Sequence, residues 1–246
     1  MVGHFAQAII RHVIDRDAKR LGRRQVDIVD AEAEAADRSA LFELPQQLTR
    51  KFGEGHENGV GVARHGKTIG LVGGRGRIGQ AVAARARGFA MRILYCGPRP
   101  MEPADESRLG AVYVPLERLL AESDFVSLHP QLTAATRHMI GARELGLMKP
   151  SAYLINTSRG AVVDEAALTA ALAEKRIAGA GLDVFEHEPH VAPALTGLAN
   201  LVVTPHLGSA VVEVRTAMAE TVVDNIAAIL AGRKPPNIVN PEALAS

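Results

Sequence analysis

The chain has 246 residues, of which 47% are hydrophobic and 22% are charged, so it can bury a sizeable core. Its 28 Lys and Arg residues against 27 Asp and Glu residues leave no net field that would attract nucleic acid or a membrane surface. The single cysteine, Cys96, excludes an internal disulfide and favours a reducing compartment. We find neither a signal-peptide pattern nor a membrane-spanning apolar stretch, and therefore expect a soluble, cytoplasmic protein.

The first part of the chain differs in pattern from the rest. Residues 5–21 and 31–52 have helical patterns, the second interrupted by Pro45, and residues 53–61 are rich in glycine. We expect a short, mostly helical N-terminal segment over residues 1–63, joined to the next domain by a flexible link.

From residue 66 onward, strand-like and helix-like segments alternate. The predicted strands, most of them continuous apolar runs, are 68–72, 92–96, 111–114, 125–128, 152–156, 179–183 and 201–204. The predicted helices are 78–89, 116–121, 142–148, 164–174 and 209–230. Apolar strands between helices are typical of a parallel sheet covered on both faces, so the sequence predicts an α/β, doubly wound, Rossmann-like fold.

The last predicted helix has apolar residues at helical spacing, namely Val211, Val212, Met218, Val222 and Ile226. Such a stripe is more often part of a core than of an interface, and we expect it to be buried.

A glycine cluster lies between the first predicted strand and the first predicted helix of this region. Gly74, Gly76 and Gly79 form G-x-G-x-x-G. Glycines let the backbone turn tightly and approach a pyrophosphate, which binds the unpaired N–H groups of the helix start. A glycine-rich turn alone is weak evidence, but the order strand, glycines, helix predicts a dinucleotide-binding site.

Three polar residues follow the ends of later predicted strands. Arg159 comes after 152–156, Asp183 ends 179–183, and His206 comes after 201–204. Ligands in open α/β sheets bind beyond the carboxyl ends of the strands, so these side chains are candidates for a site there.

Three later segments carry a family resemblance. They are LINTSRGAVVDEAAL (154–168), AGLDVFEHEP (180–189) and LVVTPHLGSA (201–210), and they accompany GRIG at 76–79. In this order they closely resemble the D-isomer-specific 2-hydroxyacid dehydrogenases, in particular the glyoxylate and hydroxypyruvate reductase group. The resemblance covers roughly residues 64–240.

The resemblance implies reversible reduction of a small 2-keto acid such as glyoxylate or hydroxypyruvate. Arg159 would bind the substrate's carboxylate and carbonyl, because a guanidinium offers a planar fork that lysine lacks. His206 would be the general acid, with Glu188 paired to it to keep its proton available. Considered singly, the three residues also fit a solvated loop arginine, a capping histidine and an ordinary turn residue.

The resemblance also implies cofactor contacts. Arg77 and Ile78 would lie at the pyrophosphate, Asp183 would hydrogen-bond the nicotinamide carboxamide, and the other expected cofactor-binding residues are Pro130, Thr157 and Gly208. Gly97 stands where NAD-dependent relatives carry Asp, and Arg99 offers a partner for a 2′-phosphate. We therefore expect NADP, with NAD possible, and no metal. Alternatively, Arg99 only decorates a Pro-rich turn and cofactor use is mixed.

The sequence departs from the family in two places. Relatives read V-G-x-G-R-I-G, whereas Val72–Gly79 here contains one additional residue. Residues 1–63 do not align with the family's substrate-binding domain, and we expect a truncated or divergent remnant there. The expected domains are then 1–63, a dinucleotide-binding domain at 64–210, and a C-terminal helix and tail at 211–246.

Two functions of different class stay open. The first is a reductase acting on a small-molecule 2-keto or 2-hydroxy acid, expected to be a homodimer as its relatives are. The second is a non-catalytic dinucleotide-binding protein, either corepressor-like or a truncated inactive homologue.

Overall fold

The structure, a computed structural model, describes residues 66–244. The helices predicted at 5–21 and 31–52 and the link at 53–61 lie outside the described residues. The described chain divides into two compact units, the first ending at Pro205 and the second beginning at His206. The domain boundaries at 63/64 and 210/211 remain predictions.

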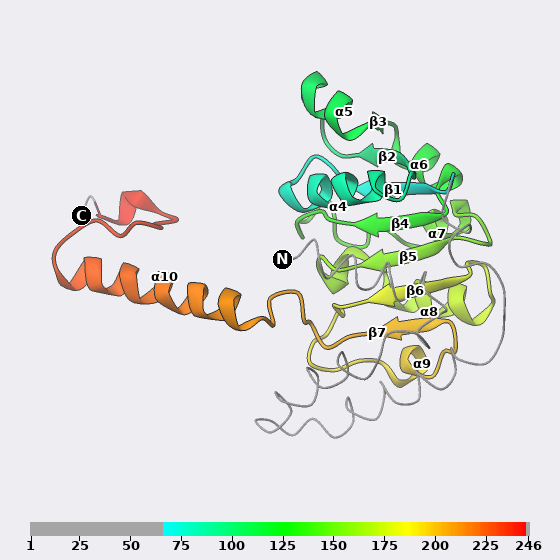
Figure 1. Ribbon diagram of the computed structural model, residues 1–246. Coiled ribbons are helices and arrows are strands. Elements are labelled where there is room, and N and C mark those ends of the chain that lie inside the picture. Colours follow the sequence, from blue (N-terminus) through cyan, green and yellow to red (C-terminus); the bar gives the residue numbers. More distant parts are fainter. Residues whose placement is uncertain (1–65, 245–246) are drawn as a thin grey trace, which may run out of the picture. The chain divides into compact units, whose positions relative to one another are not determined.

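The first unit is built on a parallel sheet. Its strands are β1 (Thr68–Val72), β2 (Arg92–Cys96), β3 (Ala111–Tyr113), β4 (Phe125–Leu128), β5 (Tyr153–Asn156), β6 (Gly179–Leu182) and β7 (Leu201–Val203). They lie in the order β3-β2-β1-β4-β5-β6-β7, with every pairing parallel (Figure 1). The strand order reverses between β1 and β4, which is where an open α/β sheet binds its ligand. The predicted doubly wound fold is confirmed.

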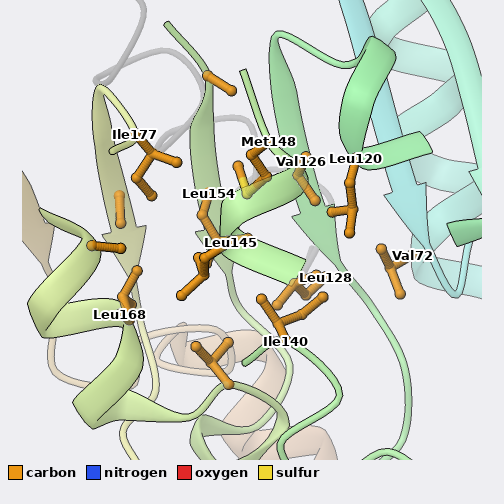
Figure 2. Close-up of a cluster of buried hydrophobic side chains, with 14 of the residues drawn as sticks. Val72, Leu120, Val126, Leu128, Ile140, Leu145, Met148, Leu154, Leu168 and Ile177 are labelled. Atoms are coloured by element: carbon orange, nitrogen blue, oxygen red, sulfur yellow. The ribbon is translucent and has the colours of Figure 1, made fainter. Parts of the chain in front are cut away.

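Helices cover both faces of this sheet. They are α4 (Arg77–Arg87), α5 (Pro103–Leu109), α6 (Leu116–Glu122), α7 (Ala142–Leu147), α8 (Glu165–Ala173) and α9 (Pro193–Thr196), with a 3-10 turn η4 at Gly160–Val162. Neighbouring strand residues face opposite sides, so Leu71 packs with α4 and Val72 packs with α6 and α7. Figure 2 shows the second of these cores, with Leu120, Leu145 and Leu168 against the strands.

The observed elements lie close to the predicted ones, and most boundaries agree or differ by one residue. Two short helices, α5 and α9, are additional to those predicted. The start and stop signals of α5 are in the sequence, since Pro103 occupies its first turn and Gly110 ends it with φ 62°. However, α5 (PADESRL) buries only Leu109 and α9 has only 4 residues, so neither shows a hydrophobic period.

The second unit contains the long helix α10 (Val212–Leu230) and a 3-10 turn η5 (Pro241–Leu244). The expectation that its apolar stripe is buried was wrong: Val212 is 70% exposed and Met218 is 58% exposed. The only other regular element described in this unit is η5, so the unit offers the stripe no second helix to pack on. None of the helices in the described part of the chain is long and apolar enough to cross a membrane.

A half-buried histidine, His129, lies just beyond β4 at the carboxyl edge of the sheet. The His129 amide donates to the Val72 carbonyl at 2.8 Å, and its Nε2 lies 3.0 Å from the hydroxyl of Ser127. Ser127 is completely buried. Burial lowers the pKa of His129 from 6.5 to about 4, so the ring is neutral at physiological pH.

Gly160 allows two loops at this edge to touch. A Cβ placed on Gly160 would lie 1.9 Å from the carbonyl carbon of Phe185. Only a residue without a side chain lets the backbone after β5 approach the backbone after β6 this closely.

We expect Gly160→Ala to lower the free energy of unfolding by at least about 2 kcal/mol, because a methyl group would force the two backbones apart. The matched control is Gly146→Ala in α7, where a Cβ meets nothing within 4 Å. That change should raise stability by about 0.5 kcal/mol through helix propensity. Urea denaturation followed by circular dichroism measures both. Equal effects of the two substitutions would contradict the close approach.

The neutral His129 predicts a pH dependence of stability. In the unfolded chain its pKa returns to 6.5, so below that pH the unfolded state takes up a proton that the folded state does not. Stability should therefore fall, by up to about 1.4 kcal/mol per pH unit, as the pH decreases from 6.5 toward about 4. Urea unfolding of the parent and of His129→Gln at several pH values isolates this contribution. Parallel pH curves for the two proteins would show that His129 is not its source.

Candidate functional site

The glycine turn after β1 is tightly hydrogen-bonded. Gly73 has φ 80° and donates to the Cys96 carbonyl at 2.9 Å, Gly74 donates to Leu71 at 3.2 Å, and Gly76 donates to Gly73 at 3.0 Å. The turn thus accommodates its additional residue, and α4 begins directly after Gly76.

The predicted fingerprint glycines lie where side chains would collide. A Cβ on Gly79 would lie 2.6 Å from the Gly74 Cα, and a Cβ on Gly74 would lie 2.6 Å from the Cβ of Tyr95. The start of α4 therefore packs directly on the end of β1 and against β2. Gly76, by contrast, is exposed, so its backbone is accessible to a ligand. These are the roles that the glycines of a dinucleotide site require.

The start of α4 is electrostatically suited to an anion. Its N-cap, Gly76, supplies no side-chain hydrogen bond, and no acidic residue lies in the first turn. Arg77 is exposed there, and Ile78 is 38% exposed. The unpaired N–H groups and the positive end of the helix dipole favour a phosphate at this position.

The loop after β2 begins at Gly97 and carries Arg99. A Cβ on Gly97 would meet nothing within 4 Å, so the missing carboxylate does not reflect a lack of space. Arg99 is exposed. This strand end presents a cation and no acidic group where an acidic residue would bind the ribose 2′-hydroxyl of NAD.

Two tyrosines that sequence reasoning missed hold this loop at both ends. The Tyr113 hydroxyl donates to the Gly97 carbonyl at 2.7 Å, and the Met101 amide donates to the Tyr95 hydroxyl at 2.6 Å. The Tyr95 hydroxyl also hydrogen-bonds Glu106. Burial and this carboxylate raise the pKa of Tyr95 to about 12, so the hydroxyl stays protonated. The loop that carries Arg99 is therefore anchored.

The loop after β5 is shaped by a buried asparagine. Asn156 Oδ1 accepts hydrogen bonds from the Ser158 amide at 3.1 Å and its hydroxyl at 2.8 Å, and Nδ2 donates to the Arg159 carbonyl at 2.9 Å. This side chain closes a turn that leaves Arg159 exposed. The sequence identified Asn156 only as a strand end.

Thr157, on the same loop, has a buried hydroxyl without a hydrogen-bond partner among residues 66–244. A buried hydroxyl without a partner is costly, and a polar group of a bound cofactor would satisfy it. The glycine turn, the helix start and this hydroxyl together fit a dinucleotide.

The loop after β6 carries Asp183 and Glu188. Asp183 is 1% exposed and accepts a 2.6 Å hydrogen bond from the Thr204 hydroxyl, while Glu188 accepts one from the Phe185 amide at 2.9 Å. Because Phe185 lies against Gly160, the structure brings the Arg159 and Glu188 loops into contact.

A further carboxylate on this loop was missed by sequence reasoning. Glu186 Oε1 lies 2.8 Å from Arg137 Nη2 and 2.6 Å from His138 Nε2, and the Glu186 amide donates to Glu165 at 2.8 Å. These contacts tie the loop after β6 to the loop after β4 and to α8. The signal available in the sequence was the acidic pair in VFEHEP, of which only Glu188 was singled out.

The remaining predicted residues fall in two places. The backbone nitrogen of Pro130 lies beside the glycine turn, 2.9 Å from where a Cβ of Gly73 would be. His206, with φ 54°, and Gly208 belong to the second unit, so their roles are based on the sequence motif. Within the described ranges, no group of His, Cys, Asp or Glu side chains could hold a metal ion.

Comparison with known proteins identifies the architecture. Residues 34–208 match the model of the D-isomer specific 2-hydroxyacid dehydrogenase, NAD binding domain. A glyoxylate reductase of Thermococcus litoralis is 56% identical over 187 residues, covering 76% of this chain and 56% of the relative. Glyoxylate/hydroxypyruvate reductase B of Enterobacter agglomerans is 52% identical over 186 residues, covering 75% and 57%. The chain thus spans just over half the length of these curated relatives.

Solved structures agree. The NADPH-dependent glyoxylate/hydroxypyruvate reductase of Sinorhizobium meliloti, in complex with NADP and malonate, superposes with a TM-score of 0.74 at 32% identity, covering 98% of this chain and 67% of that one. Together with the glycine turn and the strand-end loops, these matches show that the chain belongs to the D-isomer specific 2-hydroxyacid dehydrogenase family and contains its NAD(P)-binding domain.

Proposed function

We propose that the chain is an oxidoreductase that transfers a hydride between NADP and a small 2-keto or 2-hydroxy acid such as glyoxylate or hydroxypyruvate. The observation that supports it best is the contact between the Arg159 loop and the Glu188 loop, at the same edge of the sheet as a turn that fits a dinucleotide. The names of the related glyoxylate reductases support the same substrate class.

In this proposal the chain's own residues bind the keto acid and move its proton. The Arg159 guanidinium holds the substrate's carboxylate and polarises its carbonyl, and the Asn156 turn fixes the backbone from which it extends. His206 donates a proton to the ketone oxygen, and Glu188 orients the imidazole. The bound cofactor supplies the hydride.

The cofactor would be held by the glycine turn and by the strand-end loops. Gly74, Gly76 and Gly79 would bind the pyrophosphate with Arg77 and Ile78, while Pro130, Thr157, Asp183 and Gly208 would line the nicotinamide half. We infer NADP rather than NAD because the end of β2 carries Arg99 and no acidic group. The Sinorhizobium meliloti relative, which was solved with NADP, supports this choice. The homodimer and the cytoplasmic location stay predictions.

The direct test is NADPH consumption by the purified protein with glyoxylate, hydroxypyruvate and pyruvate. Turnover should depend on Arg159: we expect Arg159→Lys to lower kcat/KM by about 100-fold, because a lysine cannot grip a carboxylate with two parallel hydrogen bonds. Arg118→Lys, on the exposed face of α6, is the matched control and should be neutral.

NADPH binding measured alongside separates the two functional classes. Binding without turnover for any of the three acids would instead support a non-catalytic dinucleotide-binding protein, and a fully active Arg159→Lys enzyme would exclude Arg159 as the carboxylate ligand.

The cofactor preference predicts a selective effect. Arg99→Ala should raise the KM for NADPH by about tenfold and leave that for NADH unchanged, because only NADPH carries the 2′-phosphate that the guanidinium would pair with. Arg92→Ala removes the same charge from the opposite end of β2, where Arg92 pairs with Glu122 at 2.7 Å, and should change neither value. Equal changes for the two cofactors in Arg99→Ala would refute the 2′-phosphate contact.

A further inference from the structure

We propose that Arg75, a residue of the lengthened glycine turn, is a second binding residue for the 2′-phosphate of NADP, acting together with Arg99. This inference rests on the proposed NADP preference and names a residue of that site which the family pattern does not supply. Arg77 matches the arginine of the family's V-G-x-G-R-I-G, whereas Arg75 stands at the position x, for which the pattern specifies no residue type.

The register of the sheet places the turn next to the end of β2. Val72 pairs with Cys96, and the Gly73 amide donates to the Cys96 carbonyl at 2.9 Å. Arg75 comes three residues after Val72, and Arg99 comes three residues after Cys96. The two arginines therefore follow the ends of adjacent strands at the same edge of the sheet. In this fold the end of the second strand is where the ribose 2′ position binds.

Packing and hydrogen bonds fix the backbone of the turn beside β2. The Cβ direction of Gly74 points at the Cβ of Tyr95 on β2, at 2.6 Å. The Arg75 carbonyl accepts a hydrogen bond from Gln80 Nε2 at 3.1 Å, which ties its backbone to α4. Gln80 in turn accepts from Arg108, which is paired with Asp105 at 2.7 Å. The backbone of Arg75 is therefore fixed. The acidic residue of this network, Asp105, already pairs with Arg108.

The Arg75 side chain contains a buried donor, Nε, that has no acceptor among the described residues. An unpaired buried donor destabilises the protein unless a ligand supplies the acceptor. A phosphate monoester has three acceptor oxygens and close to two negative charges, so two arginines from adjacent strand ends match it better than one.

Binding measurements without substrate test this inference. Isothermal titration with NADP⁺, NAD⁺ and 2′,5′-ADP should show that Arg75→Ala weakens NADP⁺ and 2′,5′-ADP by about tenfold, or about 1.4 kcal/mol, and leaves NAD⁺ unchanged. Arg75→Gln keeps a polar side chain of similar reach and should give the same selective loss, because it lacks the charge. Arg85→Ala is the control for net charge, since Arg85 lies on α4 with its Nη1 bound to the Ala81 carbonyl at 2.8 Å. Circular dichroism confirms that each variant is folded.

The outcomes separate the inference from the function on which it rests. Equal weakening of NADP⁺ and NAD⁺ would overturn it, since Arg75 would then contact the shared pyrophosphate. Unchanged binding in both Arg75 variants, while Arg99→Ala loses NADP⁺ affinity, would overturn it and leave the proposed function intact. A parent protein that binds NAD⁺ but neither NADP⁺ nor 2′,5′-ADP would overturn the NADP preference together with the inference.

Discussion

The carboxyl edge of the sheet depends on backbone segments that approach one another more closely than any side chain would allow. Gly79 lies against Gly74 at the start of α4, and Gly160 lies against Phe185 between the loops after β5 and β6. The first contact leaves the helix N-terminus directly above the end of β1. The second holds the loop of Arg159 against the loop of Glu188. The residues proposed to bind cofactor and substrate are thereby positioned by main chain, which has fewer alternative conformations than side chains.

Buried polar side chains then fix the loops that these contacts bring together. Asn156 closes the turn before Arg159, Thr204 holds Asp183, and Tyr95 holds the segment that carries Arg99. Each of these groups is paired, as buried polar groups must be to avoid a cost in stability. The unpaired hydroxyl of Thr157 is an exception, and it lies where the cofactor is expected. The hydrogen-bonded groups therefore shape the loops at this edge.

Much of the sheet could be predicted because its strands are continuous apolar runs between helical periods, and the glycine motif follows β1 directly. The anchors formed by pairs distant in sequence, such as Thr204 with Asp183 and Arg137 with Glu186, could not be predicted in this way. The Asn156 turn is local, but the apolar pattern identified Asn156 only as a strand end. The expectation that the apolar stripe of α10 is buried was wrong for a related reason. Apolar spacing shows that a face is suited to packing but does not identify the surface that it packs on.

The distribution of charge at this edge explains how a nearly neutral chain can suit anionic ligands. Arg77, Arg99 and Arg159 are exposed, whereas Asp183 is buried and the Glu186 side chain is only 9% exposed. The three arginines thus face the solvent, whereas Asp183 and Glu186 accept hydrogen bonds from protein donors. Three cations are therefore accessible to anions at this edge although the net charge of the chain is only +1. A dinucleotide phosphate and a keto-acid carboxylate would meet the same sign of charge, one at the glycine turn and the other at Arg159, so one arrangement of arginines serves both ligands.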